Sequence, residues 1–560
     1  MNLKSHFGKN SGTSLAFFFA ILLVATVSLN SCKKEYFGLD RVKDNTWNPE
    51  LAVPLIKSTV TVPEVLRRID DQDVILIDSA TGLLALKYSS TVFSISAEQW
   101  LELPGLSTNF NHVLTAQDVA DITTNGSKTF TGSFPVGFAG PNGEDLTEIL
   151  FKGGTLSLNV NSTTGCNASV TLSLPGLTQN SAPYSSGPLA LAPFGNNSAN
   201  PALNGRRLDL DLTGAPSVFN LNFNITYQGA GAAPGQGLGF ALGLNGASGN
   251  GGPTYSEIRG DFGQQSISVP LDTIRLRIFD NNAGGVIVWD SAIVRGTFTN
   301  TYGFGIRADL PVFTVENTQT SQTLPVTFPV GMLPIAIPSA LGNYSPGTYL
   351  FELIGNNNGA NVNSVMNLNP NTLIYQGDLT ANPGSGPFNN FMRDTSKLKL
   401  DIDAILPFDG RAVGFSRIDT TDVQIFPLDG DVQEIVSVTL RLTIDNGFPA
   451  DAYAQVYLLD TTGTVLIDSL FTQTRRQVLT SPTPNAIGYV DQTKKVRTVT
   501  DIVMDRAKLE KLEAAGFGKV VLMGWVDSFN SGQVRIKIFE EYAMDLWLGM
   551  MVEAKVKIDL

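Results

Sequence analysis

The sequence predicts an all-β protein made of multiple antiparallel β-sandwich-like domains in tandem, with a few short connecting helices. Three observations predict this class. Apolar and polar residues alternate over five or more positions in many separate segments. The short continuous apolar runs and helical stretches that accompany a parallel sheet are missing. Hydrophobic residues make up 42% of the 560 residues, which is enough for several cores, whereas charged residues make up only 16%.

The expected strands follow from this alternation. Successive side chains of a strand point to opposite faces, so each segment buries one face and exposes the other. The clearest segments are 156–160, 208–212, 219–225, 274–278, 398–402, 438–444, 534–538 and 552–558. Capping sequences followed by good helix formers predict three helices between strands, at 61–68, 96–105 and 505–515.

The first 31 residues have the features of a lipoprotein signal peptide. Lys4 and Lys9 precede an uncharged apolar run at 15–29, which is shorter than the roughly 20 residues needed to cross a bilayer as a helix. The run ends in Leu29-Asn-Ser-Cys32, which resembles a bacterial lipobox and predicts lipidation of Cys32. A transmembrane anchor, and an ordinary secreted protein cleaved near Ser31, are the alternatives.

Changes in composition suggest how the rest of the chain is divided. Residues 32–47 are predicted to be a lipidated tether and 48–130 an N-terminal β-rich domain with short helices. Residues 131–397 are predicted to be a central β-sandwich region, with a Gly-rich insert at 229–253, and 398–560 a C-terminal β-sandwich domain.

One internal repeat is suggested by the alternation itself. Segments 156–174 and 440–458 align without a gap, and their apolar positions coincide. A duplicated hairpin would produce this match, but so would the two-residue period that any two strand pairs share. Both explanations remain open at the level of sequence.

The reactive side chains are few, and no catalytic residue is predicted. His112 is the one histidine after residue 31 and is interpreted as structural, and Cys166 as a small apolar or turn residue. The G-x-S-x-G, H-E-x-x-H and G-x-x-x-x-G-K-S/T motifs are absent from the sequence. No pair among the 51 acidic residues stands out for glycoside hydrolysis. The sequence therefore predicts a protein that is not an enzyme, with a carboxylate-pair hydrolase as the least favoured alternative.

Charge and composition also limit the partners. A net charge of −13 repels phosphate backbones, which argues against nucleic acid. No cofactor and no metal site are predicted, although structural calcium at the Asp-containing segments 280–282 and 429–431 is an alternative to plain turns. Trp289 and Trp525 lie beside alternating strands and are expected to pack into cores.

The lipobox and several C-terminal segments resemble those of a known group of bacterial lipoproteins. Cys32-Lys-Lys-Glu35 and the segments 406–411, 446–449 and 457–463 resemble uncharacterised outer-membrane and surface lipoproteins of the Bacteroidota. The resemblance implies a lipid anchor, here on Cys32, in the outer membrane, with the protein at the cell surface or on the periplasmic face. It implies no catalytic residues.

Short Asp-Ser/Thr triplets similar to the O-glycosylation signal of the same phylum occur six times. The same triplets also mark ordinary turns and strand starts, where the side chains bond the local backbone. The residues that would be modified are Ser79, Thr273, Ser291, Thr420, Thr461 and Ser469.

These features together favour a non-catalytic, lipid-anchored cell-envelope protein that acts as a binding or scaffold component. A lipid tether, long sheet-rich domains and the absence of catalytic motifs would suit an accessory subunit of an outer-membrane transport or secretion assembly. A surface glycan-binding lipoprotein for nutrient capture is the alternative, and it requires an exposed aromatic residue that the sequence does not identify.

Overall fold

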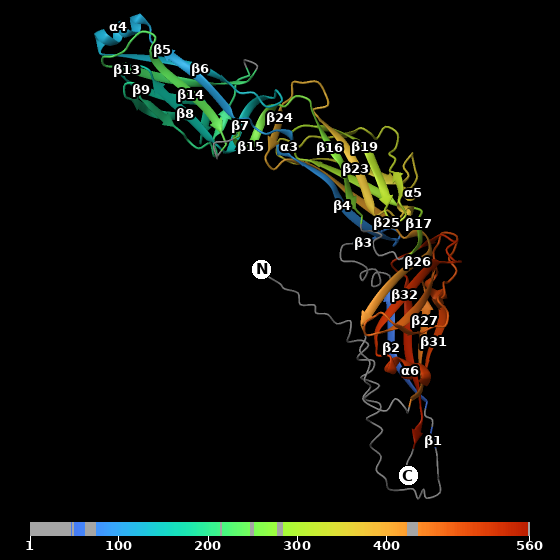
Figure 1. Ribbon diagram of the computed structural model, residues 1–560. Helices are drawn as coiled ribbons and strands as arrows, with labels where there is room; N and C mark the ends of the chain where they lie inside the picture. Colours follow the sequence, from blue (N-terminus) through green and yellow to red (C-terminus); the bar gives the residue numbers. More distant parts are fainter. Residues whose placement is uncertain are drawn as a thin grey trace.

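The computed structural model describes residues 46–47, 50–61, 74–212, 216–246, 251–276, 284–422 and 435–557. Within them almost all regular structure is antiparallel β-strand, which confirms the predicted all-β class. Cys32, the segments 280–282 and 429–431, and all of the expected helix at 61–68 except Thr61, the last residue of β2, lie outside the described residues. Figure 1 shows three β-sandwich units following one another in an elongated molecule, here called units I, II and III.

Unit I contains residues 106–245 and two sheets. The smaller sheet has the order β11 (Asn196–Ala199), β8 (Thr155–Ser162), β14 (Gly237–Asn245) and β5 (Leu106–Val113). The larger sheet has the order β24 (Asn390–Arg393), β15 (Thr254–Asp261), β7 (Asp145–Gly153), β12 (Arg207–Asp209), β9 (Asn167–Gln179), β13 (Val218–Gln228) and β6 (Ser127–Gly137), with β10 (Ala182–Leu191) paired to β9. Strands β15 and β24 join this sheet from outside 106–245.

Unit II is built in the same way. One sheet has the order β22 (Gly347–Ile354), β18 (Ile293–Asn300), β25 (Lys397–Pro407), β4 (Leu84–Ser96) and β3 (Val74–Ile77). The other has the order β16 (Gln265–Arg275), β23 (Thr372–Ala381), β19 (Ile306–Asn317) and β20 (Gln322–Pro325), with β21 (Ile335–Ile337) also paired to β19.

Unit III contains both ends of the described chain. Its smaller sheet has the order β2 (Glu50–Thr61), β34 (Ala543–Ala554), β27 (Ile435–Asn446) and β31 (Val496–Asp505). Its larger sheet has the order β17 (Gly284–Trp289), β26 (Asp409–Asp422), β32 (Phe517–Ser528), β28 (Ala450–Asp460) and β29 (Leu466–Ser469), with β30 (Arg476–Leu479) on β28 and β33 (Ile536–Lys537) on β26. Strands β1 (Thr46–Trp47) and β35 (Val556–Lys557) pair beyond it.

The three units share one strand order. In one sheet of each unit, which is the smaller sheet in units I and III, β8, β18 and β27 are equivalent, and they lie beside the equivalent strands β14, β25 and β34, respectively. On their other side, β14, β25 and β34 pair with β5, β4 and β2, respectively. The other sheet of each unit matches too, because β9, β19 and β28 pair with β13, β23 and β32, which pair in turn with β6, β16 and β26.

The units are nested along the chain. The chain first contributes β2 to unit III, β4 to unit II and β5 to unit I. The later strands then complete unit I first, unit II next and unit III last. Residues 48–130 therefore supply strands to all three units. Residue 130 falls inside β6, and residue 397 is the first residue of β25. The sheets consequently do not follow the segments 48–130, 131–397 and 398–560, because strands far apart in sequence complete each unit.

The repeat at 156–174 and 440–458 connects equivalent strands, but it is not a hairpin. In each copy the first strand lies in the smaller sheet and the second in the larger one. The connection therefore crosses between the sheets of a sandwich. Strands β18 and β19 of unit II make the same crossing, so this element occurs three times, although the alignment showed two copies.

Four short α-helices lie in the described residues. Helix α3 (Ala97–Trp100) begins with a capping box at Ser96, and α6 (Arg506–Ala514) begins at Asp505, as predicted. Helices α4 (Ala116–Asn125) and α5 (Val362–Asn367), and the 3-10 turn η3 (Gln492–Lys494), were not predicted. For α4 the signal was present, since Thr115 and Asp118 form a capping box.

The hydrophobic core is unevenly distributed. One continuous cluster runs through units I and II and includes Trp100. It also reaches Trp289, at the end of β17 in unit III. Among the described residues, unit III contributes to only two small clusters, one of which also includes Leu84 of β4. On β34 only Met550 is buried. Trp289 is 4% exposed, as predicted for a core residue, whereas Trp525 is half-buried and has the Arg475 guanidinium 6.0 Å from its ring.

Candidate functional site

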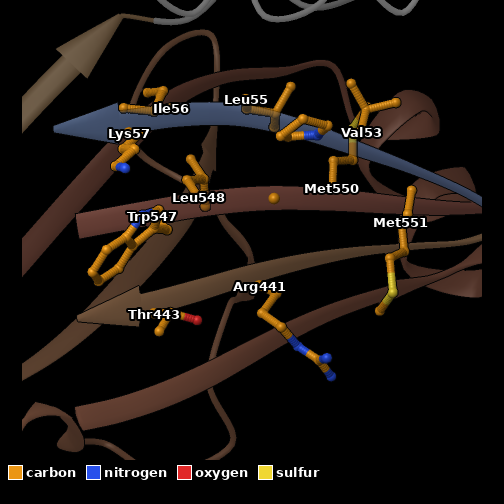
Figure 2. Close-up of a pocket in the computed structure, with 13 residues that line it drawn as sticks. Val53, Leu55, Ile56, Lys57, Arg441, Thr443, Trp547, Leu548, Met550 and Met551 are labelled. Carbon is orange, nitrogen blue, oxygen red and sulfur yellow. The ribbon is translucent and has the colours of Figure 1, made fainter. Parts of the chain in front are cut away.

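A groove of about 520 Å³ lies on the smaller sheet of unit III. Strands β2, β34 and β27 line it, and Figure 2 shows the side chains around it. The register of β2 against β34 shifts between Pro54 and Ile56, so Leu55 is an extra residue in β2. Such bulges are favoured where proline cannot donate a ladder hydrogen bond.

The floor of the groove is Gly549, which has no side chain. Its partner across the ladder in β2 is Pro54, and its partner in β27 is Arg441. A Cβ placed on Gly549 would meet nothing closer than the Val53 carbonyl oxygen at 3.8 Å. The hollow therefore results from the missing side chain beside the bulge.

Trp547 and Met551 flank Gly549 on β34, and both are half-buried. The Arg497 guanidinium carbon lies 5.6 Å from the centre of the Trp547 ring, which is within cation–π range. Lys57 pairs with Trp547 in the ladder and is exposed. The groove thus presents an aromatic surface bordered by cations.

Carboxylates next to the groove are held in the ionised form. Arg441 donates to both carboxylate oxygens of Asp501, at 2.7 Å each, and this pair lowers the pKa of Asp501. The pKa of Asp545 is lowered by hydrogen bonds from Thr59 and then Lys495. These carboxylates accept hydrogen bonds near neutral pH, and general acid catalysis would require a raised pKa instead.

The predicted glycosylation positions are spread over the molecule and do not form one site. Ser79, Thr273, Thr420 and Thr461 are exposed, on a turn before β4, on β16, on β26 and after β28. The other two positions are partly buried. The hydroxyl of Ser291 donates to Asp409 and that of Ser469 donates to the Phe471 carbonyl.

His112 and Cys166 both lie in unit I. The His112 Nδ1 atom is 3.0 Å from the Tyr227 hydroxyl, and burial lowers the pKa of His112. Cys166 is 1% exposed, and its Sγ lies 3.3 Å from the hydroxyl of Thr164. Each fills a place in the packing of the sandwich, as the sequence suggested.

The described residues contain no cluster of three or more His, Cys, Asp or Glu side chains arranged to hold a metal ion. None of the helices in this part of the chain is long and apolar enough to cross a membrane.

Comparison with known proteins identifies no family. No family model and no curated protein matches the chain. Among solved structures, "a putative secreted protein from Parabacteroides distasonis" covers 54% of this chain and 90% of its own at 10% identity and a TM-score of 0.29. The VP2 subviral particle of infectious bursal disease virus covers 82% of both chains at 8% identity and a TM-score of 0.13. Scores this low support no conclusion about fold or function.

The groove was not predicted from the sequence, although two signals for it were present. Pro54 inside an alternating apolar segment and Gly549 inside another were the available signals, because both residues are unusual in strand interiors. Their pairing across 495 positions of the chain could not be read from either segment alone.

Proposed function

We propose that the protein is a non-catalytic, lipid-anchored component of the cell envelope that binds a partner through unit III and carries unit I away from the membrane. The observation that carries this proposal is the nested order of the units. Because β2 lies in unit III and Cys32 precedes it by only 18 residues, unit III is the unit nearest the proposed anchor. Unit I lies at the opposite end of the elongated molecule (Figure 1).

The position of the groove supports a partner near the membrane. It is lined by β2, the first long strand after the tether. Val499 and Val503 lie on the same outer face and are 50% and 54% exposed. Apolar residues exposed together on one sheet face are typical of protein interfaces. A membrane-embedded transport or secretion protein is the proposed partner.

The anchor is tested by replacing Cys32 with serine in cells that express the full chain. Labelled palmitate should be incorporated by the unmodified protein and not by Cys32→Ser, which should leave the membrane fraction. Equal incorporation by both proteins would refute the anchor.

The partner is tested by pull-down of the detergent-solubilised full chain from envelopes, with identification of co-purifying membrane proteins. Gly549→Arg should fill the groove and reduce recovery of the partner at least tenfold, because the space beside Gly549 is open. Leu350→Arg places the same charge on an exposed residue of β22 in unit II and should leave recovery unchanged. Isolation of the unmodified protein as a monomer without a partner would contradict the proposal.

A further inference from the structure

The smaller sheet of unit I differs chemically from its counterparts in units II and III. Its four strands, β5, β8, β11 and β14, contain no Asp, Glu, Lys or Arg. The outward residues of β5 and β8 are amides and hydroxyls, apart from Val113 at the end of β5. They are Ser107, Asn109 and Asn111 on β5, and Thr155, Ser157, Asn159 and Asn161 on β8.

Equivalent positions in the other two units carry charges. The ladder pair Asn161 and Gly239 corresponds to Thr299 and Lys399 in unit II and to Asp445 and Asp545 in unit III. The pair Ser157 and Gly243 corresponds to Arg295 and Asp403 in unit II and to Arg441 and Gly549 in unit III.

Those charges form ion-pair ladders. In unit II, Arg295 pairs with Glu352 and Lys87 with Asp403. In unit III, Arg497 pairs with Asp445. The fold therefore accepts charged pairs on this face, and their absence in unit I is a property of that unit and not of the architecture.

The amides of the unit I face are free to bind. Asn109, Asn111 and Asn159 are exposed, and within the described residues their side chains make no hydrogen bond. Each amide offers two donor hydrogens and an acceptor oxygen. Between the two polar columns runs β14, with Ala241 directly between Asn109 and Asn159.

We propose that this face binds a neutral, hydroxyl-rich polysaccharide chain. Hydroxyl groups both donate and accept hydrogen bonds, which matches amide and serine side chains. A charged polysaccharide would have its charge desolvated with no opposite charge on the face, which is unfavourable. The small residues of β14 let an extended chain lie close to the sheet between the two columns of donors and acceptors.

An exposed aromatic residue lies in the turn before β11, at the edge of the same sheet. Phe194 is 68% exposed, and it lies two residues before β11, whose Asn196 pairs with Asn161. Its amide donates to the Thr164 carbonyl, which holds the turn in place. Phe194 is therefore an exposed aromatic residue beside this sheet, in the unit farthest from the proposed anchor.

The inference names a ligand for the proposed binding component and so rests on that function. It is tested with the purified full chain by affinity electrophoresis in gels that contain dextran, mannan, amylopectin or galactan, each compared with its sulfated form. At least one neutral polymer should retard the protein, and its sulfated form should retard it at least tenfold less. No retardation by any neutral polymer, or equal retardation by the sulfated form, would overturn the inference.

Matched variants locate the site. Ala241→Arg should weaken retardation at least tenfold, and it should fold, because the equivalent positions hold Asp401 in unit II and Trp547 in unit III. Ser94→Arg, at the unit II position equivalent to Asn111, should retain full binding. Unchanged retardation by Ala241→Arg, with circular dichroism unchanged, would show that the glycan binds elsewhere and would refute the assignment to this face.

The outcome is separate from that of the proposed function. If a membrane partner co-purifies through unit III but no neutral polymer retards the protein, the proposed function is supported and the glycan inference is refuted. A protein that binds a neutral polymer through unit I but has no membrane partner would show the reverse.

Discussion

Asn300 and Asn446 hold the same turn in two different sandwiches. Each ends the strand that precedes the crossing between sheets, and each is fully buried. The Asn300 Oδ1 atom accepts from the Tyr302 amide at 2.9 Å, and the Asn446 Oδ1 atom accepts from the Phe448 amide at 2.8 Å. In unit I the equivalent residue is Ser162, whose hydroxyl accepts from an amide two residues on. One buried side chain therefore fixes each crossing.

Replacing Asn446 should destabilise unit III. Its Nδ2 atom donates to the carbonyls of Phe448, Ala450 and Thr480. Asn446→Ala would leave several of these buried groups unpaired and should cost about 3 kcal/mol of unfolding free energy. Asn446→Ser, which keeps the bond that unit I makes, should cost less. Hydrogen exchange of β27 and β28 measures the difference, and equal protection in all three proteins would contradict this role.

The junction of units II and III should depend on Asp409. This carboxylate is 5% exposed and receives two hydrogen bonds from Arg535, just before β33. It also accepts a hydrogen bond from Ser291, in the connection between β17 of unit III and β18 of unit II. Asp409→Asn should destabilise the junction by about 2 kcal/mol, because a buried charge-assisted pair is lost. Small-angle scattering should show a wider range of shapes for this variant. Glu352→Gln breaks the more exposed pair with Arg295 and should leave both stability and shape nearly unchanged.

The stability of unit I should fall at low pH through Asp118. Hydrogen bonds from Lys128 and then Thr115 lower its pKa from 3.8 to about 2. The ionised carboxylate thus stabilises the fold above pH 3.8, and this contribution is lost as the pH falls towards 2. Asp118→Asn should cost about 1 kcal/mol at pH 7, after allowance for solvent screening, and almost nothing below pH 2. Urea unfolding of both proteins at each pH measures this, and a difference independent of pH would contradict it.

Two fragments of the chain test the nested order of the three units. Residues 106–245 contain the whole smaller sheet of unit I and most of the larger one, and the ends of this segment meet where Leu106 pairs with Leu244. This fragment should fold alone, although it exposes the part of β7 that β15 covers in the full chain. Residues 398–560 lack β2 and would expose the edge of β34, so this fragment should aggregate or dimerise. Size-exclusion chromatography and circular dichroism distinguish the two, and a stable monomer of 398–560 would show that β2 is dispensable.

Local pattern predicted much of the secondary structure. The alternation at 156–160 and 438–444 lies within β8 and β27, and the cap at Asp505 begins α6. The segment 534–538 was expected to be a strand, but only Ile536–Lys537 form one, β33. The preceding residue, Arg535, bonds to Asp409, and the alternation of residue types did not reveal this contact. The candidate groove and the uncharged face of unit I escaped prediction, since each depends on which strands lie side by side.

The sequence by itself determined that this chain forms antiparallel strands with one buried face, because side-chain alternation and capping are local properties of consecutive residues. Tertiary structure alone decided which strands pair. Glu50 lies opposite Glu553, and Asn109 and Asn159 meet across Ala241. Backbone hydrogen bonds are the same for every sequence, so a strand carries little information about its partner until the core between the sheets is packed.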